Sequence, residues 1–324
     1  MGRKRNQGPQ RHGLLLVDKH EGCTSHDIVA QARRILRQKK IGHCGTLDPA
    51  ATGLLLLTVG NATRLTRFLI RAPKIYEGSA RLGVVTDTYD ITGEVTAEQP
   101  VDGVTRDAID ETMASFLGVQ EHRPPAYSAK KVGGKKLYEL ARAGEEVEVE
   151  SKEVMIYDFR ATGEWCEGED LDFLLSCSSG TYARSMVYEL GRALGTGATL
   201  SALRRTQIGS FQLDDATTIR QLKTRMDGCV EAGDEPHLAD LGEAWIPFDD
   251  ITLPFGGVQV DAQQEKRIRH GQTVLVRDLD SQEGDWIKIA NQRREFIAVG
   301  SVVERIGTGK VGVIQPKVVF RAAD

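Results

Sequence analysis

The sequence of 324 residues predicts an α+β protein with a small β-rich module at its carboxyl end. Expected strands and helices are mixed through the first two-thirds of the chain, without the regular alternation of a doubly wound fold. Residues 256–324 then contain short apolar runs broken by glycine, which is typical of short strands. A composition of 40% hydrophobic and 27% charged residues suits a folded core and excludes a disordered chain.

The expected elements follow from apolar periodicity and from capping residues. Residues 13–18 predict a strand because they are almost continuously apolar. Residues 25–40 predict a helix, since Thr24 can cap it and Ile28 and Ala32 begin one apolar stripe. The remaining expectations are strands at 54–59, 74–82, 147–159 and 171–177, helices at 61–70, 105–117, 137–143 and 183–194, loops at 83–93 and 122–136, and a strand or extended turn at 200–208.

The formal charge of −4 conceals an uneven distribution of charge. Residues 226–250 contain eight acids and no lysine or arginine, so this segment carries −8 and the rest of the chain +4. A charge run is usually a solvated face, but three basic clusters without an intervening acid also suit a polyanion partner. The clusters are Arg33, Arg34, Arg37, Lys39 and Lys40; Arg64, Arg67, Arg71 and Lys74; and Arg123, Lys130, Lys131, Lys135 and Lys136.

Several classes of protein are excluded or disfavoured by what the sequence lacks. No apolar run approaches the roughly 20 residues of a membrane helix, and the basic start MGRKRNQGPQRHG lacks the apolar segment of a secretory signal. The five cysteines are odd in number and include no C-x-x-C pair, so we expect reduced thiols in a cytoplasmic protein. Cys44 is expected to be a small buried residue, without a metal-ligand role.

Residues 42–53, GHCGTLDPAATG, form the first candidate site. Three glycines and a proline impose an irregular backbone, and Asp48 is pushed to an extended conformation because it precedes Pro49. An acid and a histidine in such a loop suit catalysis, although Asp48 could simply cap a turn. The loop lacks the Lys-Ser/Thr ending of a P-loop and the G-x-S-x-G of a nucleophile elbow.

Two further stretches carry candidate side chains. Arg184 lies in SSGTYAR after an expected strand, where its guanidinium could pair with a carboxylate in bidentate fashion or form a surface salt bridge. Tyr76 lies on the expected strand KIYE, where it is either a packing residue or a phenol near a reacting base.

Taken together, these stretches resemble the TruB family of bacterial tRNA pseudouridine synthases, which isomerise one uridine in the T-loop of tRNA. The G-H-x-G-T-L-D-P-x-A-T-G-L-L block is the most specific motif, and the carboxy-terminal module is similar to a PUA-type RNA-binding domain. His20 departs from the family, which usually has proline there, and we expect only a local loop change. The matching stretches, in order across residues 13–211, are GLLLVDKHEGCTSHD, GHCGTLDPAATGLLLL, KIYEGSARLGVVTDTYDITG, RPPAYSAKKVGGKKLYELARAG, CSSGTYARSMVYELG and LRRTQIGSF.

The resemblance implies a division of the chain and a set of site residues. It implies a basic amino terminus at 1–12, a catalytic domain at 13–225 with a pseudouridine synthase-type mixed sheet and flanking helices, an acidic linker at 226–255 and a PUA-like domain at 256–324. By resemblance, Asp48 is the catalytic nucleophile, Arg184 its partner, and Tyr76 packs on the target base and relays a proton. Tyr182 and Leu203 match residues that contact the base, and His43 matches one that stands where the flipped nucleotide leaves its loop.

The same resemblance implies the partners and the reaction. The substrate is the T-arm of tRNA and the target is uridine 55; the protein is a cytoplasmic monomer with no cofactor, metal or membrane partner. Attack of Asp48 at C6, attack at C1′ and a glycal route remain open. The alternatives are an RNA-binding or tRNA-folding protein without essential catalysis, and a small-molecule hydrolase, for which the sequence shows no second general acid or metal cluster.

Overall fold

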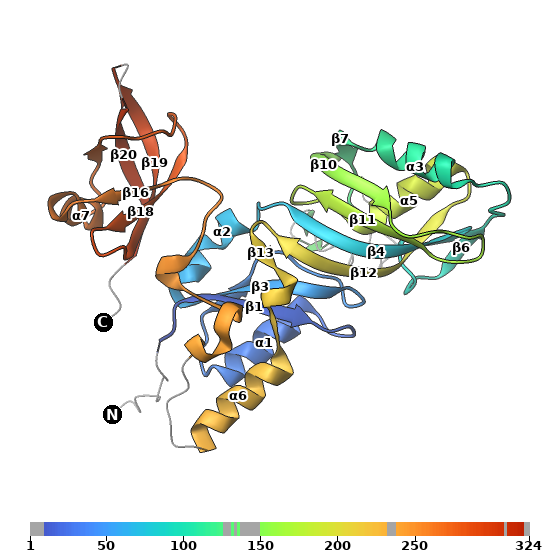
Figure 1. Ribbon diagram of the computed structural model, residues 1–324, viewed down its shortest axis with the longest axis horizontal. Helices are drawn as coiled ribbons and strands as arrows, with labels where there is room; N and C mark the ends of the chain where they lie inside the picture. Colours follow the sequence, from blue (N-terminus) through green and yellow to red (C-terminus); the bar gives the residue numbers. More distant parts are fainter. Residues whose placement is uncertain are drawn as a thin grey trace.

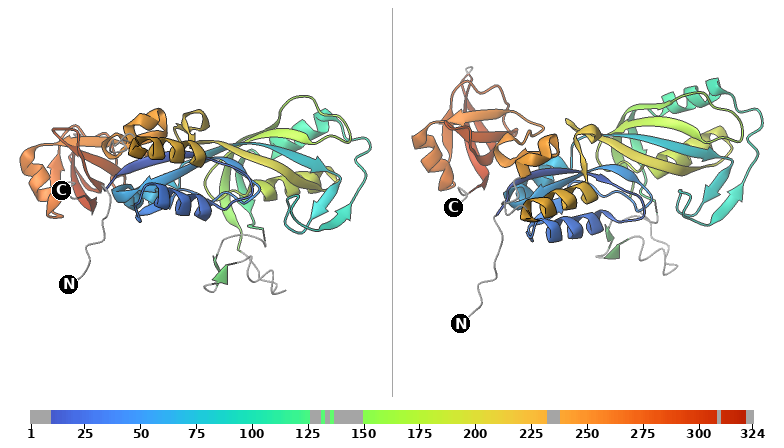
Figure 2. Two further views of the ribbon diagram at one scale, coloured as in Figure 1. Left: turned by 90° about the horizontal axis from the view of Figure 1, so that it is seen from below. Right: turned by 60° about the horizontal axis from the view of Figure 1, so that its bottom comes forward.

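The computed structural model describes residues 10–125, 131–132, 135–136, 150–231, 238–307 and 310–320. These residues form an elongated molecule in which one long mixed sheet runs through the body and a smaller β unit lies at one end (Figure 1). Figure 2 shows the same order of parts from two other sides. The predicted α+β class, with a β-rich carboxy-terminal module, is confirmed.

The body is built on one sheet with the strand order β14-β1-β3-β12-β4-β11-β10-β7, to which β2, β13 and β15 add at the sides. Its strands are β1 (Gly13–Lys19), β2 (Ile41–His43), β3 (Thr52–Val59), β4 (Lys74–Leu82), β7 (Gly118–His122), β10 (Lys152–Ala161), β11 (Leu171–Cys177), β12 (Ala198–Ile208), β13 (Phe211–Gln212), β14 (Thr217–Thr218) and β15 (Trp245–Pro247). Two hairpins lie outside it: β5 (Val84–Thr86) with β6 (Val95–Glu98), and β8 (Lys131–Val132) with β9 (Lys135–Lys136).

Helices cover the two halves of the sheet separately. Helices α1 (Ser25–Ile35) and α6 (Ile219–Glu231) pack on β1 and β3, whereas α3 (Arg106–Ser115) and α5 (Ala183–Leu194) pack on the half that contains β4, β10, β11 and β12. Burying each large apolar side chain in these layers contributes about 1.5–3 kcal/mol. The remaining helical segments are α2 (Thr66–Leu69), η1 (Gly60–Leu65), η2 (Leu213–Asp215), η3 (Leu238–Ala244) and η4 (Phe248–Asp250).

The two halves of the sheet meet where β3 runs parallel to β12. The pairing is short and joins Thr52 to Arg204 and Gly53 to Arg205. Gly53 has φ +98°, and a Cβ atom there would lie 2.3 Å from the carbonyl oxygen of Arg205, so only glycine allows this approach. The GHCGTLDPAATG loop enters β3 at this point, which places Asp48 at the junction of the two halves.

The carboxy-terminal unit is a five-stranded sheet within the described ranges, ordered β16-β18-β19-β20-β17, with one short helix. It packs on the body through aromatic side chains: Phe248 stacks on Phe296 with ring centroids 5.0 Å apart, and Phe68 meets Trp286 edge to face at 4.9 Å. Its elements are β16 (Gly257–Val260), α7 (Ala262–Arg269), β17 (Val274–Val276), β18 (Trp286–Asn291), β19 (Phe296–Ile306) and β20 (Val311–Val319).

Some sequence-based expectations need correction. The helix expected at 25–40 ends at Ile35, because Leu36 caps it and Arg37 turns to φ +50°. The acidic segment at 226–250 contains the end of α6, η3, β15 and η4, and β15 pairs with β1. The loop expected at 122–136 contains the β8–β9 hairpin, and the helix expected at 137–143 lies outside the described residues.

Two arginines of the second basic cluster contact the carboxy-terminal unit, although both residues stay exposed. The Arg64 guanidinium lies 5.2 Å from the ring of Phe320 and the Arg67 guanidinium 5.3 Å from the ring of Trp286, so both side chains hold the carboxy-terminal unit. Lys74 is buried. Of the residues in this cluster, Arg71 alone is both exposed and outside the domain interface described above.

Candidate active site

The loop that carries Asp48 is held by buried polar side chains from three other elements. Arg205 of β12 binds its start, Ser25 of α1 its middle, and Lys19 of β1 its end; all three side chains are almost fully buried. The backbone of the loop is therefore fixed independently of Asp48 itself. The contacts are Arg205 Nη2 to Gly45 O (3.1 Å), Leu47 N to Ser25 Oγ (2.8 Å), Ser25 Oγ to Leu47 O (3.2 Å), and Lys19 Nζ to Pro49 O (3.2 Å) and Ala51 O (2.5 Å).

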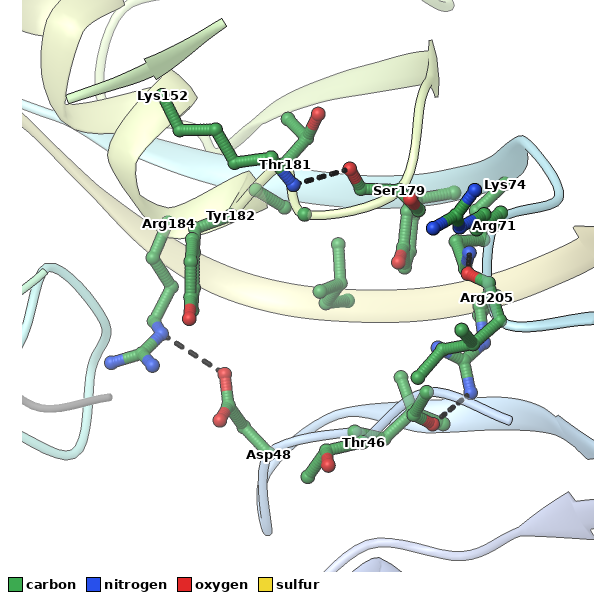
Figure 3. Close-up of a pocket in the computed structure, with 17 residues that line it drawn as sticks. Thr46, Asp48, Arg71, Lys74, Lys152, Ser179, Thr181, Tyr182, Arg184 and Arg205 are labelled. Atoms are coloured by element: carbon green, nitrogen blue, oxygen red, sulfur yellow. Dashed lines mark hydrogen bonds and ion pairs between the residues drawn. The ribbon is translucent and has the colours of Figure 1, made fainter. Parts of the chain in front are cut away.

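Asp48 forms an ion pair with Arg184, the second residue of α5. The Arg184 Nε lies 3.0 Å from Asp48 Oδ2; the Arg184 side chain is 6% exposed and the Asp48 side chain 44% (Figure 3). The guanidinium is shared, since its Nη1 donates to Thr88 O at 3.0 Å and lies 3.4 Å from Asp90 Oδ2. The predicted pairing of Arg184 with a carboxylate is confirmed, but the guanidinium is divided between two carboxylates.

The pair opens into a cavity of about 480 Å³ at the junction of the two sheet halves. Tyr76 of β4, Leu203 of β12 and Tyr182, which precedes α5, line this cavity together with Asp48 and Arg184 (Figure 3). Five of the six site residues expected from the sequence are therefore brought together. Their catalytic and binding roles remain predictions.

His43 is the sixth expected site residue, and it does not line this cavity. It ends β2, where its ring meets that of His26 edge to face with centroids 5.3 Å apart. Burial lowers the pKa of His43, and the nearby His26 and Arg205 lower it further, so the neutral ring is favoured. Within the described part of the chain, its Nδ1 is buried without a hydrogen-bond partner.

The end of the cavity away from Asp48 is lined by cationic side chains. Arg71, Lys74, Lys152 and Arg205 all contribute to its wall (Figure 3). Lys74 is buried and donates to the carbonyls of Ile70 and Ala72, at 2.7 and 2.6 Å. Burial, together with the nearby charge of Arg205, lowers the pKa of Lys74 to about 8. This end of the cavity suits an anionic group.

Tyr182 is positioned from behind by a buried histidine of β7. The backbone N–H of Tyr182 donates to His122 Nε2 at 2.8 Å, and the two rings stack with centroids 5.9 Å apart. Burial lowers the pKa of His122 to about 4, so the ring is neutral at pH 7 and Nε2 can accept this hydrogen bond. The start of α5, and with it Arg184, is thereby tied to the outer half of the sheet.

Sequence reasoning missed the residues that support the site. Lys19, Ser25, Asp90, His122 and Arg205 lie in or beside the quoted motifs, but no role was assigned to them. A signal was available for two of them, because Lys19 directly follows the strand expected at 13–18 and Arg205 lies in the strand or extended turn expected at 200–208. A buried cation in such a place needs buried acceptors, which here are backbone carbonyls.

The described residues show neither a metal site nor a membrane-spanning helix. They contain no group of three or more His, Cys, Asp or Glu side chains that could hold a metal ion. None of the helices they form combines the length and the apolar character needed to span a bilayer. Cys44 is buried as expected, and burial raises the pKa of its thiol to about 12.

Solved structures and family models define the class of this protein. The fold resembles that of "Crystal Structure of a Cbf5-Nop10-Gar1 Complex", with a TM-score of 0.74 and 26% identity over 97% of this chain and 90% of that one. It also resembles "Structure of H/ACA RNP bound to a substrate RNA containing 2'-deoxyuridine", with a TM-score of 0.73 and 25% identity over 96% of this chain and 85% of that one. Residues 33–183 match the model "TruB family pseudouridylate synthase (N terminal domain)", so the class is pseudouridine synthase, an isomerase.

The rest of the chain and its curated relatives identify the family. Residues 184–244 match "tRNA pseudouridylate synthase B C-terminal domain" and residues 256–320 match "Pseudouridine synthase II TruB, C-terminal". The protein named tRNA pseudouridine synthase B from Nitrosococcus oceani is 40% identical over 93% of this chain and 94% of its own length. Its namesake from Solibacter usitatus is 40% identical over 90% and 96%. The chain therefore belongs to the TruB family, and the resemblance seen in its motifs is confirmed.

Proposed function

We propose that this protein isomerises uridine 55 in the T-loop of tRNA to pseudouridine, with Asp48 as the catalytic carboxylate. The observation that carries the proposal is the ion pair of Asp48 with Arg184 inside a cavity that Tyr76 and Leu203 also line. The names of the curated relatives, which are tRNA pseudouridine synthases, support tRNA as the substrate.

The reaction breaks the bond between N1 and C1′ of uridine, rotates the base and rejoins it through C5, with no net oxidation or reduction. Asp48 supplies the carboxylate for this exchange, by attack at C6, attack at C1′ or a glycal route. In each case the carboxylate must be held against the nucleotide. The Arg184 guanidinium does so from a buried position, while 44% of the Asp48 side chain stays exposed to the cavity.

Tyr76 and Leu203 form the apolar part of the binding site for the base. Burial raises the pKa of Tyr76, and the nearby Arg205 opposes this shift, so the phenol is neutral at pH 7. A neutral phenol can pack on a uracil ring and relay the proton that leaves C5. Tyr182 adds a second aromatic ring at the cavity wall, which suits a base extruded from its stack.

Base extrusion explains the need for an open cavity and for cations around it. The target base is stacked in the T-loop, and unstacking it costs a few kcal/mol. Arg71 and Lys152 at the cationic end of the cavity can contact backbone phosphates and offset this cost. His43 then stands outside the cavity, where we expect it to fill the space that the flipped nucleotide leaves.

In this proposal the chain divides into a catalytic domain and parts that bind RNA. Residues 13–225 form the catalytic domain, residues 226–255 the segment that follows it, and residues 256–324 a PUA-like RNA-binding domain. The protein acts as a cytoplasmic monomer on the T-arm, without a cofactor. The β8–β9 hairpin, with Lys131, Lys135 and Lys136, lies in the segment that we expect to contact the RNA arm.

The test is to incubate the protein with an unmodified tRNA transcript and to map pseudouridine at nucleotide resolution. We expect one new pseudouridine, at position 55, and none in a matched transcript with cytidine there. Modification at another position would overturn the assigned target. A protein that binds the transcript tightly but forms no pseudouridine would instead fit an RNA-binding or tRNA-folding role without essential catalysis.

A further inference from the structure

Tyr89 has a backbone conformation that is unusual for its residue type. Its φ is +63°, in the left-handed region that bulky side chains rarely adopt. Such a conformation persists only where surrounding contacts enforce it, and these conformations are common at functional sites. Tyr89 lies between Thr88 and Asp90, and both of these neighbours contact Arg184.

The ring of Tyr89 stacks on Tyr188 of α5. The ring centroids are 4.1 Å apart and the ring planes are inclined by 19°, which is a close stacked contact. The backbone is held as well: the N–H of Leu200 donates to Tyr89 O at 3.0 Å, and the N–H of Tyr89 donates to Thr86 O at 3.3 Å. The segment is thus attached to β12 by its backbone and to α5 by its ring.

Arg184 and Tyr188 are four residues apart in α5, so they project from one face of the helix on successive turns. Arg184 contacts this segment at Thr88 O and Asp90 Oδ2. Tyr188 contacts it through the ring of Tyr89, which lies between those two residues in the chain. A single helix face therefore sets the distance between the segment and the guanidinium that holds Asp48.

The backbone of Asp90 pairs with Leu200 of β12, and its side-chain contacts other than Arg184 lie within its own turn. Its Oδ1 accepts hydrogen bonds from Thr88 Oγ1 at 2.9 Å and from the N–H of Thr92 at 3.0 Å, and both residues belong to the same turn. These bonds fix the carboxylate within the turn, but they do not attach the turn to α5. Besides the contacts of Arg184, the Tyr89–Tyr188 stack joins this turn to α5.

We propose that the Tyr89–Tyr188 stack positions Arg184, and through it Asp48, for catalysis. The inference depends on the proposed role of Asp48. The stack holds the Thr88 carbonyl and the Asp90 carboxylate against Arg184 Nη1, and this leaves Nε directed at Asp48. The exposed Asp48 side chain has little packing of its own, so its placement depends on this chain of contacts. Tyr89 and Tyr188 are positioning residues, since the cavity that Asp48 occupies is not lined by either of them.

The substitution Tyr89→Gly separates the role of the ring from that of the strained backbone. Tyr89→Gly relieves the strain at φ +63° while it removes the stack, so folding is retained. We expect kcat to fall about tenfold with a much smaller change in KM for the tRNA transcript, because neither ring lines the cavity that holds Asp48. Tyr89→Phe keeps the ring and should stay near wild type. Tyr157→Leu, at an exposed tyrosine of β10 to which no role is assigned, is the control and should leave kcat unchanged.

A double mutant identifies the stack itself as the cause. Tyr188→Leu should reproduce the loss from the helix side, and it gives the same test if Tyr89→Gly fails to fold. The double mutant Tyr89→Gly/Tyr188→Leu should lose no more of kcat than either single mutant, because both substitutions remove the same ring contact. A kcat close to wild type in folded Tyr89→Gly, or full additivity in the double mutant, would overturn the proposal.

Asp48→Asn is assayed in the same series to keep the two proposals apart. If Asp48→Asn is inactive and the Tyr89 and Tyr188 variants are normal, the positioning proposal fails and the proposed function stands. If Asp48→Asn remains fully active, the proposed role of Asp48 fails, and the positioning proposal fails with it.

Discussion

Arg184 links two carboxylates that have different surroundings. Asp90 is largely buried and held by its own turn, whereas Asp48 projects into the open cavity. The planar guanidinium can face both at once because its donors point in fixed, different directions. An ammonium group has no such geometry, so the arrangement depends on arginine and not only on positive charge.

Asp48→Asn tests the carboxylate directly. The amide is nearly the same size, so the loop contacts of Arg205, Ser25 and Lys19 should persist and the protein should fold and bind tRNA. Product formation should be lost, because an amide is not a nucleophile. Single-turnover conversion at saturating enzyme measures this. A single-turnover rate above about one per cent of wild type would mean that Asp48 is not the catalytic nucleophile. That rate corresponds to an increase in the barrier of less than about 2.7 kcal/mol.

Arg184→Lys tests the shared guanidinium. Lysine keeps the charge but cannot contact Asp48, Asp90 and Thr88 O together, so we expect a loss of at least about tenfold in the single-turnover rate with tRNA affinity retained. Arg81→Lys is the control, since Arg81 pairs with Asp170 at an exposed site where a pair contributes only about 0–1 kcal/mol. Equal rates for both variants and wild type would show that the Arg184 ion pair is structural.

The residues that line the cavity were easier to predict from the sequence than the residues that support them. Asp48, Tyr76 and Arg184 stand in motifs whose loops and strand ends suggest exposure to a ligand. Ser25 and His122 have no such pattern, because their importance comes from the partners that folding brings to them: Leu47 for Ser25 and the N–H of Tyr182 for His122. A local sequence does not specify such partners.

At the scale of elements, the strands and helices were largely predictable from apolar periodicity. The strand expected at 74–82 and the helix expected at 183–194 are found as β4 and α5. The end of α1 was misplaced because the basic residues after Ile35 suit a helix terminus, while Gln38 instead exchanges hydrogen bonds with the backbone of Arg11. Helix α6 was not expected, because the acids Asp227 and Glu231 near its end were interpreted as the start of a linker.

The contact between β7 and the start of α5 predicts a pH dependence of stability. His122 has a pKa of about 4 in the folded protein, below its ordinary value of 6.5. Between these values the unfolded chain binds a proton that the folded protein does not, so the free energy of unfolding falls as pH is lowered from about 6.5 to about 4. The difference corresponds to roughly 3 kcal/mol, since one pKa unit is 1.36 kcal/mol.

Substitution of His122 isolates this contribution. His122→Gln cannot titrate but keeps an acceptor for the N–H of Tyr182, so its unfolding free energy should vary less with pH across this window. Urea unfolding at several pH values between about 4.5 and 7 measures the slope. His270→Gln replaces the exposed histidine that caps the carboxyl end of α7 and should leave the slope unchanged. A wild-type slope in His122→Gln would show that other groups control acid stability.

At the scale of the whole molecule, the charge pattern of the sequence did not reveal the contact between the two domains. Arg64 and Arg67 belong to a cluster predicted to suit a polyanion; both are exposed, and their guanidinium groups also lie against the rings of Phe320 and Trp286. Their neighbour Phe68 joins one apolar cluster with residues of both domains. The carboxy-terminal unit is therefore packed on the body, and deleting it would expose this cluster as well as remove a binding surface.

A point substitution at this interface tests the docking of the carboxy-terminal unit without a deletion. Trp286→Ala removes the ring that meets Phe68 and Arg67, and a partly buried aromatic lost in this way costs about 2–4 kcal/mol. We expect a lower melting temperature and weaker tRNA affinity, because the unit no longer holds its position relative to the cavity. The single-turnover rate at saturating enzyme should be unchanged, since every residue proposed to act in the reaction lies in the body. Leu275→Ala, at an exposed position of β17 in the same unit, is the control for the melting temperature and should behave as wild type. A loss of the saturated rate in folded Trp286→Ala would mean that the carboxy-terminal unit takes part in forming the active site as well as in binding.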